Sequence, residues 1–198
     1  MRIVKIIVSY IALLFFGGNV MADVSSNIQK ATFAGGCFWC VEAEFDKVKG
    51  VISAVSGYIG GKEKNPTYKQ VSKGQTGHIE SVEITFDANR ISYKQLLDIY
   101  WKNIDPHDDF GQFCDKGPQY KSAIFYHDES QKMLAESSKK ELEEKFNFDI
   151  VTKILKADIF YDAEEYHQNY HIKNPLRYKF YRHSCGRDKR LKEIWKKN

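Results

Sequence analysis

The part of this sequence best suited to chemistry is the segment GGCFWC at residues 35–40, which follows a short strand-like run at residues 30–34. Two glycines between a strand and a helix allow a tight turn, so Cys37 is expected at the helix start. Unpaired backbone N–H groups and the helix dipole favour an anion there, so we expect a lowered pKa and a populated thiolate. Phe38 and Trp39 add bulky aromatic surface. The pattern predicts a reactive thiol beside an apolar pocket.

The cysteine content favours redox chemistry over scaffolding. Four cysteines are too few to staple a chain of this length into a disulfide-rich mini-domain, although an oxidising compartment would let pairs form. One pair has the spacing CxxC and the other two are scattered. The four are Cys37, Cys40, Cys114 and Cys185.

Hydrophobic periodicity predicts an α+β fold in which strands and helices form two layers. The expected strands are residues 31–34, 52–58, 79–86, 122–127 and 152–157, and the expected helices are residues 37–48, 93–103 and 130–146. The first six elements run β-α-β-β-α-β, which is the order of a split βαβ or ferredoxin-like sandwich. We expect an additional C-terminal helix and an irregular tail around this unit.

A carboxylate is predicted on the buried face of the third strand. Apolar and polar residues alternate along residues 79–86, as a half-buried strand requires. Val82, Ile84 and Phe86 would face the core, and Glu80 shares their register. An ionised, unpaired carboxylate there costs several kcal/mol, so Glu80 is either paired for structural reasons or kept protonated for use.

The N-terminus is typical of a secretory signal peptide. A short basic start precedes an apolar run at residues 6–16, and Val20 and Ala22 occupy the −3 and −1 positions of a cleavage site. A membrane-spanning helix needs about 20 apolar residues, so this run is too short, although an uncleaved N-terminal anchor is the alternative. We expect a signal peptide at residues 1–22, export across the inner membrane to the periplasm, and a single domain at residues 23–198.

The charge balance excludes nucleic acid as an expected partner. The formal net charge is +4, and it falls to +2 when Arg2 and Lys5 leave with the signal peptide. The basic segment at residues 189–197 is expected to be a short solvated tail with Trp195 packed onto the domain. We expect a monomer.

Seven motifs in order resemble the peptide methionine sulfoxide reductase A family, from residue 31 to about residue 195. They are GGCFWCVE, GYIGG, NPTY, GHIES, DKGPQYKSAIFY, EEYHQNY and KNPLRYKFYRHSCGRD. The resemblance implies reduction of methionine S-sulfoxide, free or within proteins, by a single-domain enzyme that uses no cofactor and a thioredoxin-like electron donor. One reductase class serves each sulfoxide epimer.

The resemblance also implies a role for each site residue. Cys37 matches the nucleophile that attacks the sulfoxide sulfur and becomes a sulfenic acid, and Glu80 matches the proton donor. The polar wall that binds the sulfoxide oxygen corresponds to Tyr68, Tyr120 and Asp115. The aromatic floor for the S-methyl group corresponds to Phe38 and Trp39.

The thiol that resolves the sulfenic acid has two candidates. Cys185 matches a common C-terminal resolving position, and the adjacent Gly186 suggests a mobile tail. Cys40 lies three residues after Cys37 on the same helix side, but a bond between them would strain a helical first turn. We favour Cys185. Cys114 is expected to be a small buried residue.

Three other interpretations carry less weight. His167 and His171 have the spacing of a zinc-protease helix, but Gln168 stands where that motif needs its glutamate, so a structural role is expected and no metal site is predicted. The CxxC spacing suits a thioredoxin-like disulfide oxidoreductase, although the order of elements does not. A non-catalytic binding module that uses only the aromatic pocket is the remaining alternative.

Overall fold

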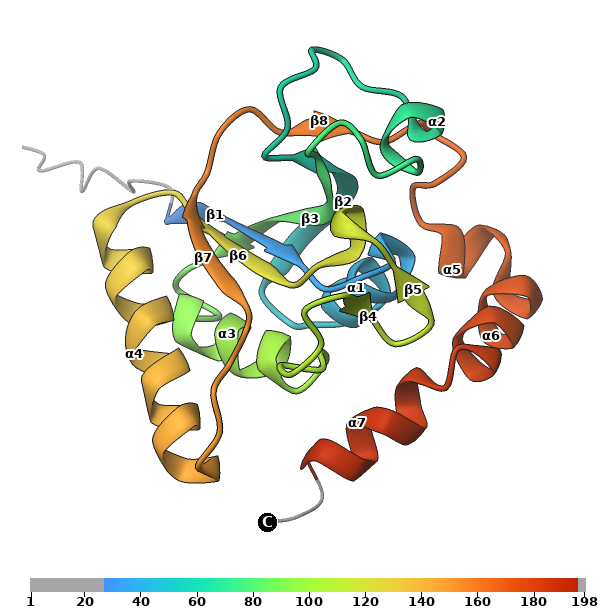
Figure 1. The fold of residues 1–198 in the computed structure, drawn as a ribbon. Coiled ribbons are helices and arrows are strands. Elements are labelled where there is room, and N and C mark those ends of the chain that lie inside the picture. Colours follow the sequence, from blue (N-terminus) through green and yellow to red (C-terminus); the bar gives the residue numbers. More distant parts are fainter. Residues whose placement is uncertain (1–26, 196–198) are drawn as a thin grey trace, which may run out of the picture.

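The computed structural model describes residues 27–195. These residues form a six-stranded mixed sheet with helices packed around it (Figure 1). The strands lie in the order β7-β6-β1-β3-β2-β8. All neighbours are antiparallel except β6 and β7, which are parallel. Their bounds are β1 Ile28–Ala34, β2 Val51–Ile59, β3 Ile79–Asp87, β6 Ala123–Tyr126, β7 Lys153–Lys156 and β8 Tyr161–Asp162. The five expected strands are therefore present, and β8 was not expected.

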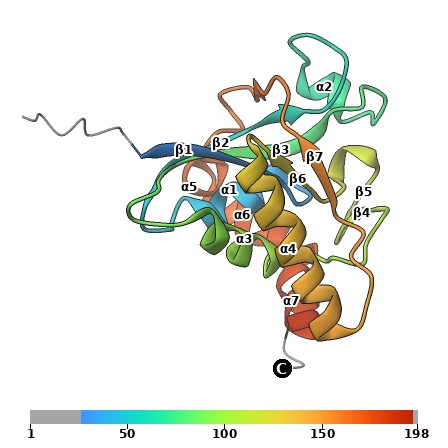
Figure 2. The same ribbon diagram turned by 90° about the vertical axis from the view of Figure 1, so that its left-hand side faces the viewer.

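Three helices cover one face of this sheet (Figure 2). They are α1 Phe38–Phe45, α3 Tyr93–Trp101 and α4 Glu129–Phe146, which confirms the three expected helices with small changes at their ends. The core between the two layers is aromatic: the Phe33 ring of β1 stacks on Phe45 at 5.4 Å and on Tyr100 at 4.8 Å between ring centroids. The prediction of an α+β fold is thus confirmed.

The expected order β-α-β-β-α-β runs along the chain through β1, α1, β2, β3, α3 and β6, with insertions. The short helix α2 Tyr68–Val71 lies between β2 and β3. Before β6, the chain forms a small second sheet of β4 Gly111–Gln112 and β5 Asp115–Lys116, followed by the 3-10 turn η1 Pro118–Tyr120. These insertions carry side chains of the candidate site.

The C-terminal region is helical, which confirms the expected additional C-terminal helix, whereas the expectation of an irregular tail is wrong. It forms α5 Tyr170–Lys173, α6 Pro175–Ser184 and α7 Arg187–Trp195. Pro175 occupies the first turn of α6, where its missing N–H is harmless. The Trp195 indole N–H donates to the Ile104 carbonyl at 3.4 Å, which confirms that this ring packs onto the domain.

The predicted signal peptide lies outside the described residues, as do residues 196–198. Within residues 27–195, every helix is too short or too polar to cross a membrane.

Candidate active site

The turn between β1 and α1 places Cys37 at the start of the helix, as predicted. Gly36 adopts a φ of +80°, and a Cβ there would come within 2.6 Å of the Gln112 side chain. Cys37 is the N-cap residue, with φ −49° and ψ 118°, so α1 begins at Phe38. The glycine therefore allows both the turn and the close approach of β4.

The Glu80 carboxyl lies directly beside this helix start. It is 2% exposed, and its Oε2 accepts the backbone N–H of Phe38 at 3.2 Å. Burial, together with the charge of Asp115 and Cys40, raises its pKa to about 8 against the opposing effect of that hydrogen bond. Among residues 27–195, no ion pair involves Glu80. Of the two interpretations left open by the sequence, the geometry favours a protonated carboxyl.

Two tyrosine hydroxyls complete the polar surroundings of Glu80. Tyr68 is the first residue of α2, and Tyr120 ends the turn η1. Their hydroxyls interact with each other, and burial together with the charges of Glu80 and Cys37 raises the pKa of Tyr68 to about 12. Burial and Glu80 raise the pKa of Tyr120 as well. Both side chains are therefore neutral hydrogen-bond donors at physiological pH.

Asp115 is held by two donors, one of which the sequence analysis missed. Its carboxylate accepts the Tyr181 hydroxyl at 2.5 Å and the backbone N–H of Cys37. Burial raises the pKa of Asp115, and the hydrogen bonds from these two donors oppose that rise. Tyr181 also approaches the Cys37 thiol within hydrogen-bond range. Tyr181 lies four residues before Cys185, a spacing that places both side chains on the same side of a helix. This spacing could have identified Tyr181 from the sequence.

The two aromatic residues of the motif differ in accessibility. Phe38 is 1% exposed and packs in the core against Tyr58, so it contributes little open surface. Trp39 is half-buried and stacks on Tyr170, with ring centroids 3.8 Å apart. An open groove of about 530 Å³ adjoins it, lined by Trp39, Tyr170, Leu176, Arg177, Phe180 and Tyr181. The apolar surface next to the thiol therefore comes mainly from Trp39 and the C-terminal helices.

His167 and His171 support this surface. The His167 ring is buried, and its Nδ1 accepts the indole N–H of Trp39 at 3.1 Å. His171 faces the Asp46 carboxylate, with Nε2 3.5 Å from Oδ2. The structural role expected for both histidines stays a prediction.

Cys37 and Cys40 are free thiols in contact, and their ionisation differs from expectation. Burial, the hydrogen bond to Cys40 and the nearby carboxyls raise the pKa of Cys37, so the predicted lowering by the helix start is wrong. The same hydrogen bond and the charges of Arg187 and Arg182 lower the pKa of Cys40 to about 7. The two thiols therefore titrate as a coupled pair, in which the pKa of Cys40 is lowered and that of Cys37 is raised.

Cys114 and Cys185 form a disulfide. Cys114 is exposed, so the expectation of a small buried residue is wrong. Cys185 is the C-cap residue of α6 and lies in a helical segment, not in an irregular tail. Its Sγ is 3.9 Å from the Asp115 carboxylate, which places this disulfide at the margin of the site.

Arg187 is a second residue that sequence reasoning missed. It is 1% exposed, and its guanidinium donates to the carbonyl oxygens of Gly35 at 3.1 Å and Asn103 at 2.7 Å. It therefore fastens α7 to the turn that carries Cys37 and supplies positive charge near Cys40. A buried arginine gives no distinctive pattern in a basic C-terminal segment.

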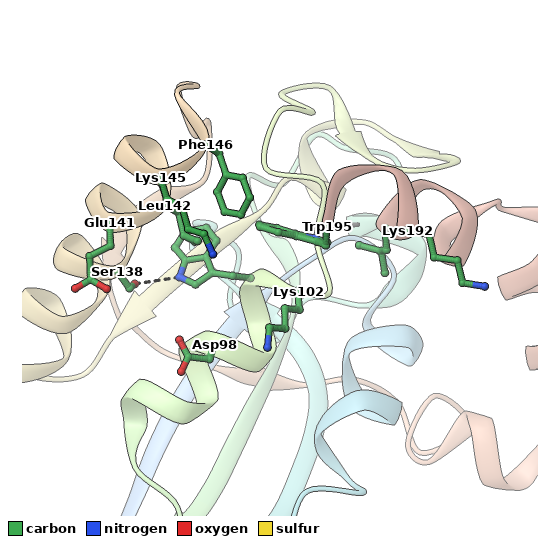
Figure 3. A pocket seen from close by; sticks show the side chains of 11 residues that line it. Asp98, Lys102, Ser138, Glu141, Leu142, Lys145, Phe146, Lys192 and Trp195 are labelled. Atoms are coloured by element: carbon green, nitrogen blue, oxygen red, sulfur yellow. Dashed lines mark hydrogen bonds between the residues drawn. The ribbon is translucent and has the colours of Figure 1, made fainter. Parts of the chain in front are cut away.

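A second apolar cavity lies away from these residues, between α3, α4 and α7 (Figure 3). It measures about 540 Å³, and none of the predicted site residues lines it. Trp101 donates its indole N–H to Ser138 at 3.0 Å on one side, and Trp195 of α7 forms another wall. This cavity is where α7 packs on the domain, and it contains no candidate nucleophile.

Comparison with known proteins extends over nearly the whole described chain. The model of the family described as "Peptide methionine sulfoxide reductase" matches residues 29–198. The chain is 52% identical to peptide methionine sulfoxide reductase MsrA of Bacillus licheniformis over 167 residues, covering 83% of this chain and 92% of that protein. It is 47% identical over 179 residues to the MsrA/MsrB protein of Vibrio cholerae, and the match covers 89% of this chain and about half, 47%, of that protein.

Solved structures share the fold. Reduced Mxr1 of Saccharomyces cerevisiae superposes with a TM-score of 0.71 at 33% identity, covering 76% of this chain and 88% of that chain. Methionine sulfoxide reductase A of Corynebacterium diphtheriae gives a TM-score of 0.68 at 30% identity and covers 76% of each chain. A further structure shows Mxr1 in complex with Trx2.

A buried pair of thiols, a protonated carboxyl and neutral hydroxyl donors together define a thiol-based oxidoreductase. The family model and the relatives fix the class more narrowly. The chain belongs to the peptide methionine sulfoxide reductase family, in its MsrA class.

Proposed function

We propose that this protein reduces methionine S-sulfoxide, free or within oxidised proteins, to methionine and thereby repairs oxidised proteins. The observation that carries the proposal is the 3.2 Å contact between the Glu80 carboxyl and the Phe38 N–H, which holds a protonated acid beside Cys37. A thiol can attack a sulfoxide sulfur productively only if the oxygen is protonated as it gains charge. The resemblance to MsrA proteins supports the same substrate.

In the first half of the reaction, the Cys37 sulfur attacks the sulfoxide sulfur. Cys40 is placed to take the Cys37 proton through their hydrogen bond, since the pKa of Cys40 is lowered and that of Cys37 is raised. Glu80 protonates the sulfoxide oxygen, and the hydroxyls of Tyr68 and Tyr120 hold that oxygen as neutral donors. Methionine leaves, and Cys37 becomes a sulfenic acid.

The substrate's S-methyl group fits the aromatic surface at Trp39, since sulfur and methyl groups make favourable contacts with rings. Phe38 supports Trp39 from the core. Asp115 positions the start of α1 by accepting the Cys37 backbone N–H, and Tyr181 holds Asp115 in turn. These residues select an oxidised methionine by its one oxygen and its methyl group.

We infer that Cys40 forms the first disulfide with Cys37. We expected this bond to be strained because we placed both cysteines inside the helix. In the structure, Cys37 is the N-cap residue and lies outside the helix. Side chains at N-cap and N3 approach each other, as the reciprocal contacts of a capping box show. Cys185, which we favoured from sequence, is joined to Cys114.

We infer that a thioredoxin-like protein supplies the electrons. Mxr1, which shares the fold, has been solved in complex with Trx2. The donor would reduce an intramolecular disulfide of this chain.

For the fold, we propose that the strands β6-β1-β3-β2 and the helices α1 and α3 form a ferredoxin-like unit. The antiparallel order of these four strands supports this assignment.

We also propose export to the periplasm after removal of residues 1–22, on the strength of the N-terminal pattern alone. N-terminal sequencing of the protein recovered from the periplasm would test this. A mature chain that begins near Asp23 supports export, and an intact Met1 in the cytosolic fraction contradicts it.

The proposed activity is tested by mixing the purified protein with methionine S-sulfoxide and dithiothreitol and measuring free methionine. The R epimer serves as the control substrate and should not react. Cys37→Ser should abolish the reaction, because an alcohol of high pKa does not attack at neutral pH. Turnover of this variant above a few per cent of the wild-type rate would exclude Cys37 as the nucleophile.

A further inference from the structure

The two thiol pairs of this chain differ in their access to another protein. Cys37 is 6% exposed and Cys40 is 2% exposed, whereas Cys114 is exposed and Cys185 is half-buried. Thiol–disulfide exchange requires the attacking thiolate to reach a sulfur of the disulfide directly. A disulfide between Cys37 and Cys40 would therefore be poorly accessible to the active-site cysteines of a protein donor.

The exposed pair is nevertheless connected to the buried one through a single carboxylate. The Asp115 side chain accepts the backbone N–H of Cys37 and lies 3.9 Å from the Cys185 Sγ. Cys114 directly precedes Asp115 in the chain, so both halves of the exposed disulfide flank this carboxylate. A short movement of Cys185 would bring its sulfur from Cys114 to the site.

We propose that Cys114 is the terminal thiol of an internal relay, which transfers the oxidation from the buried site to an exposed Cys114–Cys185 disulfide. This inference rests on the proposed reductase function. The protein donor would then reduce the exposed disulfide and never enter the substrate site. Cys114 had no role in the sequence analysis, and the relay gives it one.

The exchange steps balance without a further reactant. Cys40 attacks the Cys37 sulfenic sulfur, so a Cys37–Cys40 disulfide forms and water leaves. The Cys185 thiolate attacks one sulfur of that disulfide and releases the other, which takes a proton. Cys114 then attacks the Cys185 sulfur of the mixed disulfide, and the second site thiol is released and protonated. Two electrons and two protons thus pass from the exposed dithiol to the buried pair.

Contacts outside the disulfide keep α6 at the site when the disulfide opens. Arg182 forms an ion pair with Glu44 of α1 at 2.9 Å, with both side chains largely buried. Tyr181, one turn before Cys185, donates to Asp115 at 2.5 Å. The reduced Cys185 therefore remains near the buried pair, as the second step requires.

The first experiment maps disulfides in the wild-type chain. The fully reduced protein receives one equivalent of methionine S-sulfoxide without a reductant, is alkylated after the reaction, and is digested for mass spectrometry. We expect Cys114–Cys185 in an amount equal to the methionine released, with Cys37 and Cys40 alkylated. A disulfide that stays on Cys37 would overturn the relay, and a failure to release methionine would overturn the proposed function instead.

The second experiment compares reductants in Cys114→Ser. This variant should still release about one methionine per enzyme in a single turnover, which also shows that it folds. With thioredoxin, thioredoxin reductase and NADPH, its turnover should fall at least about tenfold, because no exposed disulfide forms. With dithiothreitol, which is small enough to enter the site, turnover should stay within about twofold of wild type.

Ser184→Ala is the matched control, since Ser184 is exposed at the end of α6 beside Cys185 and belongs to neither pair. It should match the wild type with both reductants. Full thioredoxin-dependent turnover of Cys114→Ser would overturn the relay. An equal loss with both reductants would also overturn it, because that result indicates a purely structural disulfide.

Discussion

The two cysteine pairs show how the same side chain serves different purposes in different surroundings. Cys37 and Cys40 lie at the start of a buried helix, among Glu80, Asp115 and two tyrosine hydroxyls, where proton transfers can be controlled. The disulfide between Cys114 and Cys185 joins the turn between β4 and β5 to the end of α6. Burial favours the sulfoxide chemistry because it keeps Glu80 protonated, but it also denies access to a protein reductant. In the proposed relay, the buried pair performs the chemistry and the exposed pair exchanges electrons with the protein donor.

The largest effect expected, after loss of the nucleophile itself, is that of Glu80→Gln. The substitution keeps the shape and removes the transferable proton, so methionine release should slow by about 10²–10⁴, the usual scale of general acid catalysis. Substrate affinity should change much less. Rapid-quench measurement of the first turnover tests this directly, because it does not depend on the reductant.

The exposed pair should be unaffected by this substitution, which makes it a useful internal control. Reduction of a preformed Cys114–Cys185 disulfide by thioredoxin should proceed at the wild-type rate in Glu80→Gln. An unchanged rate of methionine release with weakened affinity would mean that Glu80 only positions the substrate.

The second prediction concerns stability, in which the two pairs should again differ. The Cys114–Cys185 disulfide spans 71 residues, so it restricts the unfolded chain strongly and should contribute about 2–4 kcal/mol to the free energy of unfolding. A Cys37–Cys40 bond closes only a very short loop and should contribute far less. Urea titration of the wild type with and without dithiothreitol measures the difference.

Cys114→Ser supplies the comparison for this titration, since its stability should barely respond to dithiothreitol. If the wild type is equally stable with and without the reductant, the disulfide does not constrain the unfolded chain. The two cysteine pairs would then differ only in their exposure to solvent and not in their effect on stability.

The third prediction is a narrow pH optimum for methionine release. The reaction needs an ionised thiol pair, so the rate should rise as pH increases through about 7, the pKa of Cys40. It also needs protonated Glu80, so the rate should fall about tenfold per unit as pH increases above about 8. Single-turnover rates measured across neutral pH test both the rise and the fall of the rate. In Glu80→Gln, the fall above pH 8 should disappear and the rise through pH 7 should remain. A rate that stays constant above pH 8 in the wild type would contradict the role of Glu80 as the acid.

The sequence was sufficient to predict most of the elements and the position of Cys37, because the GGC turn and the alternation around Glu80 are local patterns. It failed where burial decides the outcome. The helix start alone suggested a lowered pKa for Cys37, whereas desolvation and two carboxyls raise it. An additional C-terminal helix was expected, but without bounds and followed by an irregular tail, since α6 and α7 bury few apolar residues and are stabilised by contacts with distant segments such as that of Arg187 with Gly35. Long-range contacts of this kind leave no periodic signal.

Tyr181, on α6, is a site residue that the sequence analysis missed, and its removal should give the smallest effect. Its hydroxyl donates to Asp115, which in turn accepts the Cys37 backbone N–H, so Tyr181 is a positioning residue for the start of α1. Tyr181→Phe removes one hydrogen bond, for which a net loss of about 1 kcal/mol, or about fivefold in the rate of methionine release, is typical.

A specific signature separates this role from a general loss of packing. With one donor fewer, the pKa of Asp115 should rise further, so the Tyr181→Phe rate should fall more steeply than the wild-type rate as pH decreases. Tyr126→Phe on β6 removes a hydroxyl outside the site and should leave both rate and profile unchanged. A uniform decrease at every pH would show instead that Tyr181 acts only by packing α6 against Trp39, with which its ring makes an edge contact at 5.8 Å between centroids. Cys185 would then be held near the buried pair by this packing and by the ion pair of Arg182 with Glu44.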